Sequence, residues 1–318
     1  MSELAISELR SFFPEGLRAD DCAVAVFRGF GPDDVAADGP IRHELGDATL
    51  ILLRASLRAP RFTALTVVDD GGRMRFSQEA EEFVTPDSLH VVLATPLSES
   101  VLDEDERTAR AFEVLEVTAG LVAAFMGSAA VHEHVTTVVL TPSDGVILNS
   151  GLLPVPTSAG RPRADEAALA FVQSAATALA GLPPRGSHRV KLAIRWYRSS
   201  TTDQGTDSFI RSWVALETLA MPDGVNIKPI NAALGKIYDL PAEEIKSRFL
   251  IGQMADLRAR VLHGGSLAEV PAGLVYYMQA VFQDLLRDEL GLSPSHRAGR
   301  ILDRDGSSLR KSLRQLRR

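Results

Sequence analysis

The stretch Ala255-Asp-Leu-Arg-Ala-Arg-Val-Leu-His-Gly-Gly265 decides how the second half of this sequence is expected to fold. It predicts the end of a helix, because two glycines follow it and glycine readily terminates helices. Arg258 and, five positions later, His263 lie there among mostly apolar neighbours. An arginine and a histidine in this setting are candidates for chemistry at a phosphodiester, but the spacing is not specific without a structural context.

The residues around this stretch indicate that the whole second half is helical. Apolar positions recur every three to four residues, and the connections are short, so neighbouring helices should pack antiparallel as a bundle. Leu309, Leu313 and Leu316 recur among arginines in 297–318, which predicts a basic amphipathic helix. The expected helices are 165–180, 189–199, 207–220, 230–239, 242–249, 251–263 and 272–290.

The first half has a mixed pattern instead. Runs rich in β-branched residues predict strands, and residues 4–13 and 102–127 have the pattern of helices. Asp69-Asp-Gly-Gly72 predicts a hairpin turn, because glycine tolerates the positive φ of tight turns. We therefore expect an α+β domain with a mainly antiparallel sheet. Its predicted strands are 22–27, 49–53, 62–68, 89–93, 135–140 and 146–148.

Composition and charge divide the chain at the same place. Residues 151–163 are rich in proline, glycine and small polar residues and are the expected linker between a domain at 1–150 and one at 164–318. Residues 1–160 carry 11 basic and 25 acidic residues, whereas 161–318 carry 23 and 16. A polyanion would therefore dock on the second domain. A solvated tail that supplies the excess of basic residues is the alternative.

Several classes of protein are disfavoured by simple counts. Cys22 is the only cysteine, so no disulfide framework or cysteine metal cluster can form within one chain. The acidic N-terminus is unlike a signal peptide, and the longest uncharged apolar run, 117–131, is shorter than the roughly 20 residues that span a bilayer. We expect a cytoplasmic protein that does not enter the membrane and binds no cofactor.

His132-Glu133-His134 lies just before an expected strand and has two interpretations. Alternation along a strand would place both imidazoles on one face, as a metal site requires. No third ligand is evident, and a solvated strand end explains the pattern without a metal. We therefore predict no metal site.

The helical half resembles a known family. The segment from Tyr197 to Gly264 is similar to the HEPN family (higher eukaryotes and prokaryotes nucleotide-binding), in particular its Apea-like branch. The matching blocks are Trp213-Val-Ala-Leu-Glu-Thr-Leu219 on one expected helix and Asp256-Leu-Arg-Ala-Arg-Val-Leu-His-Gly264 on a later one. The resemblance covers about half of the chain and does not extend to residues 1–150.

This resemblance implies a metal-independent endoribonuclease that acts as a homodimer, with Arg258 and His263 of each protomer at a shared cleft. It further implies a role in antiviral defence or as a toxin, in which the first domain binds a regulatory protein or ligand. The sequence departs from the family at Ala259, where RNase members often have a polar residue. A non-catalytic module that binds RNA, a nucleotide or a protein therefore remains the alternative, and a dimerisation scaffold is a third possibility.

The residue types suit the implied chemistry. RNA cleavage through the 2′-hydroxyl needs a group that moves protons, as histidine can near neutral pH, and a cation that stabilises charge on the phosphate, as arginine can. On an ideal helix the two side chains point about 140° apart, so the helix end and the long reach of Arg258 must bring them together. Arg260 competes for the role of Arg258. A helix cap at His263 with a surface ion pair at Arg258 is the structural alternative.

Glu217 is the third candidate. Its neighbours on the expected helix, Trp213, Val214, Ala220 and Met221, are apolar, so its carboxylate should be partly buried and need a partner. We predict that Glu217 holds Arg258 in place. An ion pair between Glu217 and another basic residue is equally compatible with the sequence.

Overall fold

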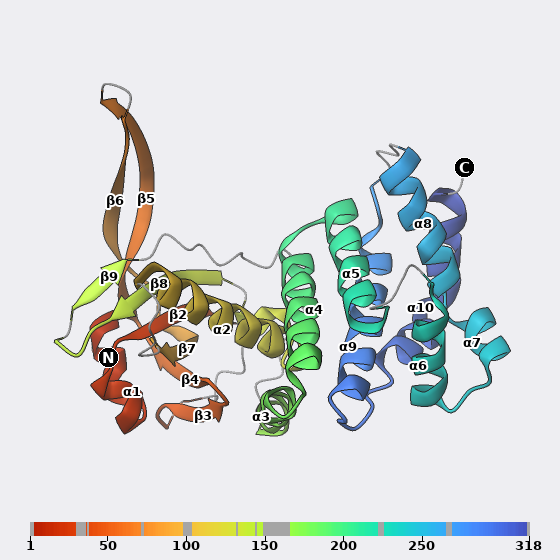
Figure 1. The fold of residues 1–318 in the computed structure, drawn as a ribbon, viewed down its shortest axis with the longest axis horizontal. Helices are drawn as coiled ribbons and strands as arrows, with labels where there is room; N and C mark the ends of the chain where they lie inside the picture. The colour runs from red at the N-terminus through yellow and green to blue at the C-terminus, as the bar shows by residue number, and fades with distance from the viewer. Residues whose placement is uncertain are drawn as a thin grey trace. The chain divides into compact units, whose positions relative to one another are not determined.

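The computed structural model describes residues 3–29, 36, 38–70, 73–97, 104–131, 133–143, 145–148, 166–221, 226–264 and 269–316. The fold is α+β, as predicted: an N-terminal unit with a largely antiparallel sheet precedes an all-helical unit (Figure 1). The two compact units are residues 1–173 and 174–318, and their boundary lies within α3 (Glu166–Ala180). The linker predicted at 151–163 lies outside the described residues. None of the described helices is long and apolar enough to cross a membrane.

The N-terminal unit is built on a six-stranded sheet in the order β3-β4-β7-β2-β8-β9. Every neighbouring pair in it is antiparallel. Its strands are β2 (Cys22–Arg28), β3 (Ile41–Leu45), β4 (Ala48–Ala55), β7 (Ser88–Pro96), β8 (Glu133–Leu140) and β9 (Val146–Leu148). Five of the six expected strands are in this sheet. The sixth, 62–68, belongs to a second sheet.

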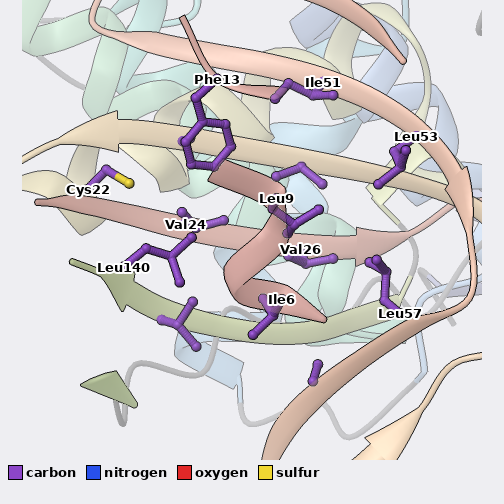
Figure 2. Close-up of a cluster of buried hydrophobic side chains, with 14 of the residues drawn as sticks. Ile6, Leu9, Phe13, Cys22, Val24, Val26, Ile51, Leu53, Leu57 and Leu140 are labelled. Carbon is purple, nitrogen blue, oxygen red and sulfur yellow. The ribbon is translucent and has the colours of Figure 1, made fainter. Parts of the chain in front are cut away.

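Both faces of the six-stranded sheet are covered. On one face, η1 (Ile6–Phe12) places Ile6 and Leu9 over alternate residues of β2, such as Val24 and Val26 (Figure 2). The intervening residues of β2 are also fully buried, and α2 (Glu104–Phe125) packs against β2, β4 and β7. Burial on both faces explains why β2 is an unbroken apolar run rather than an alternating one.

A second, three-stranded sheet forms a long ribbon. β5 (Leu57–Asp70) and β6 (Arg73–Val84) pair antiparallel and extend away from the six-stranded sheet, and β1 (Leu4–Ala5) joins β5 in parallel (Figure 1). Asp70 pairs with Arg73, so the hairpin predicted at 69–72 is confirmed at its flanks. The two glycines of its turn lie outside the described residues.

One local prediction for this unit is partly right, and two strands were missed. Residues 4–13 contain a short helix, as predicted, but it is a 3-10 helix at Ile6–Phe12 that follows a short strand, and the chain is extended at Phe13 because the residue before Pro14 is disfavoured in the α region. The strands β3 and β6 were not expected. Both strands are rich in charged residues, whose propensity for strands is low. They form because they pair with β4 and β5, and this pairing cannot be read from their own residues.

The central helix of the helical unit is α9 (Ala272–Glu289). Its buried residues include Leu274, Tyr277, Met278 and those from Ala280 to Leu286. Every helix predicted in this half is present, with ends that differ by a few residues. The other helices are α4 (Pro184–Thr202), α5 (Gly205–Ala220), α6 (Lys228–Tyr238), α7 (Ala242–Arg248), α8 (Ile251–Gly264) and α10 (Arg297–Leu316).

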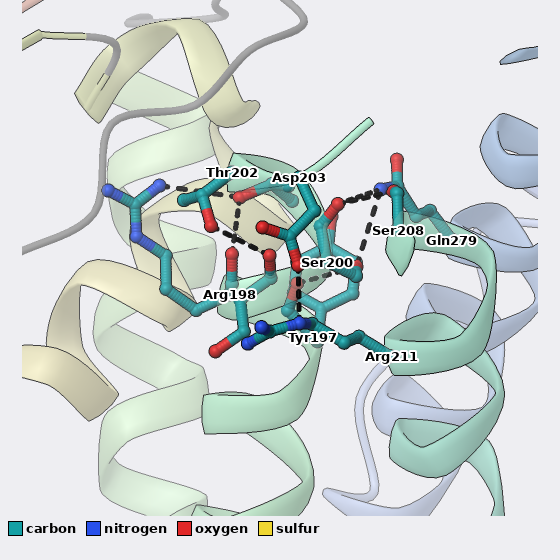
Figure 3. A network of polar contacts seen from close by, with 10 residues as sticks. Tyr197, Arg198, Ser200, Thr202, Asp203, Ser208, Arg211 and Gln279 are labelled. Carbon is teal, nitrogen blue, oxygen red and sulfur yellow. Dashed lines mark hydrogen bonds and ion pairs between the residues drawn. The ribbon is translucent and has the colours of Figure 1, made fainter. Parts of the chain in front are cut away.

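The junction between α4 and α5 fixes the helix that carries Glu217. Ser208 at the start of α5 donates a hydrogen bond to the carbonyl of Ser200, and Arg211 forms an ion pair with Asp203 in the connection (Figure 3). From α9, the amide of Gln279 donates to the same carbonyl at 3.3 Å. Because α9 and α5 meet on the end of α4, the register of α5 is set at its first turn.

Residues 297–316 form a packed helix, α10, rather than a solvated tail. Leu309 and Leu313 are buried, as the amphipathic pattern predicts. The buried carboxylate of Asp284 on α9 accepts the backbone N–H groups of Arg297 and Ala298 at 3.0 and 2.8 Å. These are orphan donors at the first turn of α10, so Asp284 caps this helix from its neighbour.

Candidate functional site

The candidate site lies where α5 and α8 meet, and it contains Arg258 and Glu217. Arg258 is in the second half of α8, and Glu217 is in the last turn of α5. The Nη2 atom of Arg258 lies 3.5 Å from Oε1 of Glu217, and the two side chains are 27% and 24% exposed. The structure therefore brings this predicted pair together in a partly buried position.

A third residue orients the carboxylate. The indole Nε1–H of Trp213 donates a hydrogen bond to Oε1 of Glu217 at 2.7 Å, one helical turn earlier on α5. Trp213 is 2% exposed, so its ring is held by the core. From the sequence, no role in binding Glu217 was predicted for Trp213. The signal that could have identified it is the four-residue spacing, which places a buried indole donor beside a carboxylate.

This arrangement leaves Arg258 anchored but able to bind another anion. A guanidinium has five N–H donors, and the ion pair with Glu217 involves only Nη2. The Nε of Arg258 is buried and has no hydrogen-bond partner among the described residues. The exposed part of the guanidinium can bind phosphate oxygens while Nη2 stays paired with Glu217.

His263 follows on the same helix. Its backbone belongs to the last turn of α8, whereas its side chain lies outside the described residues. The helix reaches Gly264, as the two glycines of the sequence predict. A helix C-terminus stabilises a protonated histidine, because the last carbonyls are directed toward it.

Arg260 has a different role from the one considered for it. Its Nη1 donates to the carbonyl of Leu316 at 2.8 Å, at the last turn of α10. The last carbonyls of a helix have no partner within the helix, so Arg260 caps α10 from α8. Its guanidinium is thereby committed to the contact between the two helices.

Two other candidate reactive groups have structural settings. Burial raises the pKa of the Cys22 thiol to about 11, so this cysteine is a poor nucleophile. Glu133 and His134 are the first two residues of β8: Glu133 forms an ion pair with Arg28, and Nε2 of His134 lies 2.6 Å from Oγ1 of Thr137. His132 lies outside the described residues, and those that are described contain no group of three or more residues suited to holding a metal.

Two pockets of the helical unit are lined by residues other than Arg258 and Glu217. One, of about 540 Å³, is lined by the ends of α5 and α9, and another, of about 480 Å³, by the start of α8 and the end of α7. Asp256, two residues before Arg258, lines the second.

We compared the chain with protein-family models, with curated proteins and with solved structures, and no match was found.

Proposed function

We propose that the helical unit is a metal-independent endoribonuclease of the HEPN type that acts in the cytoplasm as a homodimer. The observation that carries the proposal is the anchoring of Arg258 by Glu217 on the helix that ends at His263. A partly exposed cation and a histidine on one helix supply the residue types needed to cleave RNA through its own 2′-hydroxyl.

The reaction divides between the two residues. The 2′-oxygen attacks the adjacent phosphorus and loses its proton, the bond from phosphorus to the 5′-oxygen breaks, and that oxygen gains a proton. His263 transfers protons in this step, and Arg258 stabilises the negative charge that builds on the phosphate oxygens. Glu217 touches neither reacting atom and acts as a positioning residue for Arg258.

The resemblance adds a biological context to this proposal. RNA cleavage would then serve antiviral defence or a toxin function, and the N-terminal α+β unit would control it by binding a regulatory protein or ligand. The second candidate function, a non-catalytic module that binds RNA, a nucleotide or a protein, is favoured by Ala259 beside Arg258.

Purified protein incubated with mixed RNA and a chelator tests the proposal. We expect fragments with cyclic 2′,3′-phosphate ends, and a loss of rate on the order of 10²-fold or more for Arg258→Ala and for His263→Ala. Lys236→Ala is the matched control, because Lys236 also forms an ion pair with an acid, Asp288, in this unit. Its rate should stay near that of the parent.

Two results would contradict the nuclease. RNA that stays intact but shifts on a gel supports the binding module. Cleavage by the Arg258→Ala/His263→Ala double variant at the parental rate removes this site from the reaction. Melting curves of each variant show whether a loss of rate arises from a loss of fold.

A further inference from the structure

The outer face of α10 carries a line of cations. Five cations of α10 lie within about 100° of one another around the helix axis, at 100° per residue. They are here called the cation stripe and are Arg297, Arg300, Arg304, Lys311 and Arg314. The buried side of the helix, with Leu309 and Leu313, is opposite to them. At a rise of 1.5 Å per residue the stripe is about 25 Å long.

Acidic residues on α10 lie beside the stripe and not within it. Asp303 forms an ion pair with Arg248 of α7 at 2.8 Å, and Asp305 forms one with Arg304, also at 2.8 Å. The gap between Arg304 and Lys311 is filled by the exposed Ser307 and Ser308, whose hydroxyls are also hydrogen-bond donors. Apart from the pairing of Arg304 with Asp305, the centre line of the exposed face therefore presents groups that favour anions.

An exposed aromatic ring stands at one end of the stripe. Tyr276 on α9 is a large aromatic residue, and it is 42% exposed. Nη2 of Arg297 donates to its hydroxyl at 2.6 Å, and the guanidinium lies 5.2 Å from the ring centroid. At the other end, Arg260 joins Leu316 of α10 to α8, the helix that carries Arg258.

We propose that the cation stripe and Tyr276 bind one strand of RNA, with its phosphates along α10 and a base stacked at Tyr276. Proteins that bind single strands combine a positively charged track with aromatic rings on which bases stack, and both are present here. A lipid surface or an acidic peptide would also meet the cations but has no base for the ring. The choice of RNA over DNA rests on the proposed function, whereas the binding surface does not.

Binding of a labelled 2′-O-methyl RNA oligonucleotide tests this surface independently of cleavage, because that strand has no free 2′-hydroxyl to react. We expect the quadruple Gln variant of Arg300, Arg304, Lys311 and Arg314 to bind at least tenfold more weakly. The slope of log K against log salt should fall by about 3, since each phosphate contact to a single strand contributes about 0.7. The matched control replaces the exposed cations Arg185, Lys228, Lys236 and Lys246 with Gln and makes the same change in charge. It should bind within about twofold of the parent.

The ring has its own test. Tyr276→Ala should weaken binding of the oligonucleotide roughly tenfold and leave heparin, a polyanion without bases, unaffected. Tyr276→Phe keeps the ring and should bind like the parent. Equal losses in the two quadruple variants, an equal loss for heparin with Tyr276→Ala, or tighter binding to anionic lipid vesicles than to the oligonucleotide would each overturn the proposal. If the quadruple variant melts early, the double variant Lys311→Gln/Arg314→Gln provides the same comparison with half the expected change in slope.

This result is separable from that of the nuclease experiment. A parent protein that binds the oligonucleotide but cuts no RNA contradicts the proposed function and leaves the surface intact. A parent that cuts RNA while the quadruple variant binds as tightly as the parent contradicts the surface alone.

Discussion

Glu217 Oε1 is the atom at which Trp213 and Arg258 meet, at 2.7 and 3.5 Å. A carboxylate that accepts a hydrogen bond from a buried indole loses rotational freedom, and the arginine paired with it is oriented in turn. In the proposed reaction Trp213 is therefore a positioning residue that acts on the phosphate through Glu217 and Arg258.

Trp213→Phe should lower kcat roughly tenfold with little change in KM, because an aromatic side chain is kept but the N–H donor is lost. The free energy of unfolding should fall by more than the roughly 1 kcal/mol of one hydrogen bond, because the smaller ring also leaves a cavity at this buried position. The chain has two tryptophans, so the indole N–H signal of Trp213 can be identified by NMR in a Trp196→Phe background. It should shift in Glu217→Gln. An unshifted signal, or parental kcat in Trp213→Phe, would remove Trp213 from this role.

At the scale of elements, the central strand β7 contains a buried histidine whose protonation opposes folding. His90 is fully buried, and burial, with a smaller effect of Arg28 on the neighbouring strand, lowers its pKa from 6.5 to about 4. The unfolded chain then binds more protons than the folded one between these two pH values. Stability from this residue is present above pH 6.5 and is lost as the pH falls toward 4.

Between pH 7 and pH 5 this linkage should cost the parent about 2 kcal/mol of unfolding free energy. His90→Leu keeps the position apolar and cannot be protonated, so its stability should fall by correspondingly less over the same interval. Urea unfolding of both proteins at the two pH values measures the difference. Equal losses in the two proteins would show that His90 is not the group that titrates.

Because α10 is packed against the helical unit, its charge cannot be removed by truncation without a loss of stability. Removal of residues 297–318 would expose the partners of Leu309 and Leu313 and leave the buried carboxylate of Asp284 without the N–H groups of α10. A truncated protein would therefore lose stability together with charge. Replacement of exposed cations on the intact helix separates the two effects.

For the molecule as a whole, the proposed dimer makes a prediction about α8. Leu262, next to His263, is 47% exposed, as expected for an apolar side chain that a second copy covers. Light scattering should give twice the chain mass of 34.3 kDa. Leu262→Arg should reduce the mass to that of one chain and abolish cleavage.

Leu192→Arg is the control, since Leu192 on α4 is also an exposed leucine, at 37%. Its mass and activity should match those of the parent. A parent that stays monomeric at every concentration would contradict a cleft shared by two protomers.

The sequence by itself determined the α+β class, the helices of the second half and the candidates Arg258, His263 and Glu217. Helical periodicity and glycine stops are local properties, so they can be identified without knowledge of the fold. The pairing of Glu217 with Arg258 could be anticipated because a carboxylate among apolar neighbours needs a cation, although the sequence left the identity of that cation open.

Only the tertiary structure decided the two unexpected strands and the partners of the site residues, because these depend on contacts between residues far apart in the chain. Strands β3 and β6 exist through pairing with β4 and β5, which the propensity of their charged residues does not favour. Arg260 has the same charge as Arg258 and lies two positions away, yet it caps α10, since a difference of about 200° around a helix directs neighbouring arginines to different partners. The four-residue spacing of Trp213 and Glu217 on α5 is a local feature, whereas the contact of Arg258 with the same carboxylate oxygen depends on the packing of α8 against α5.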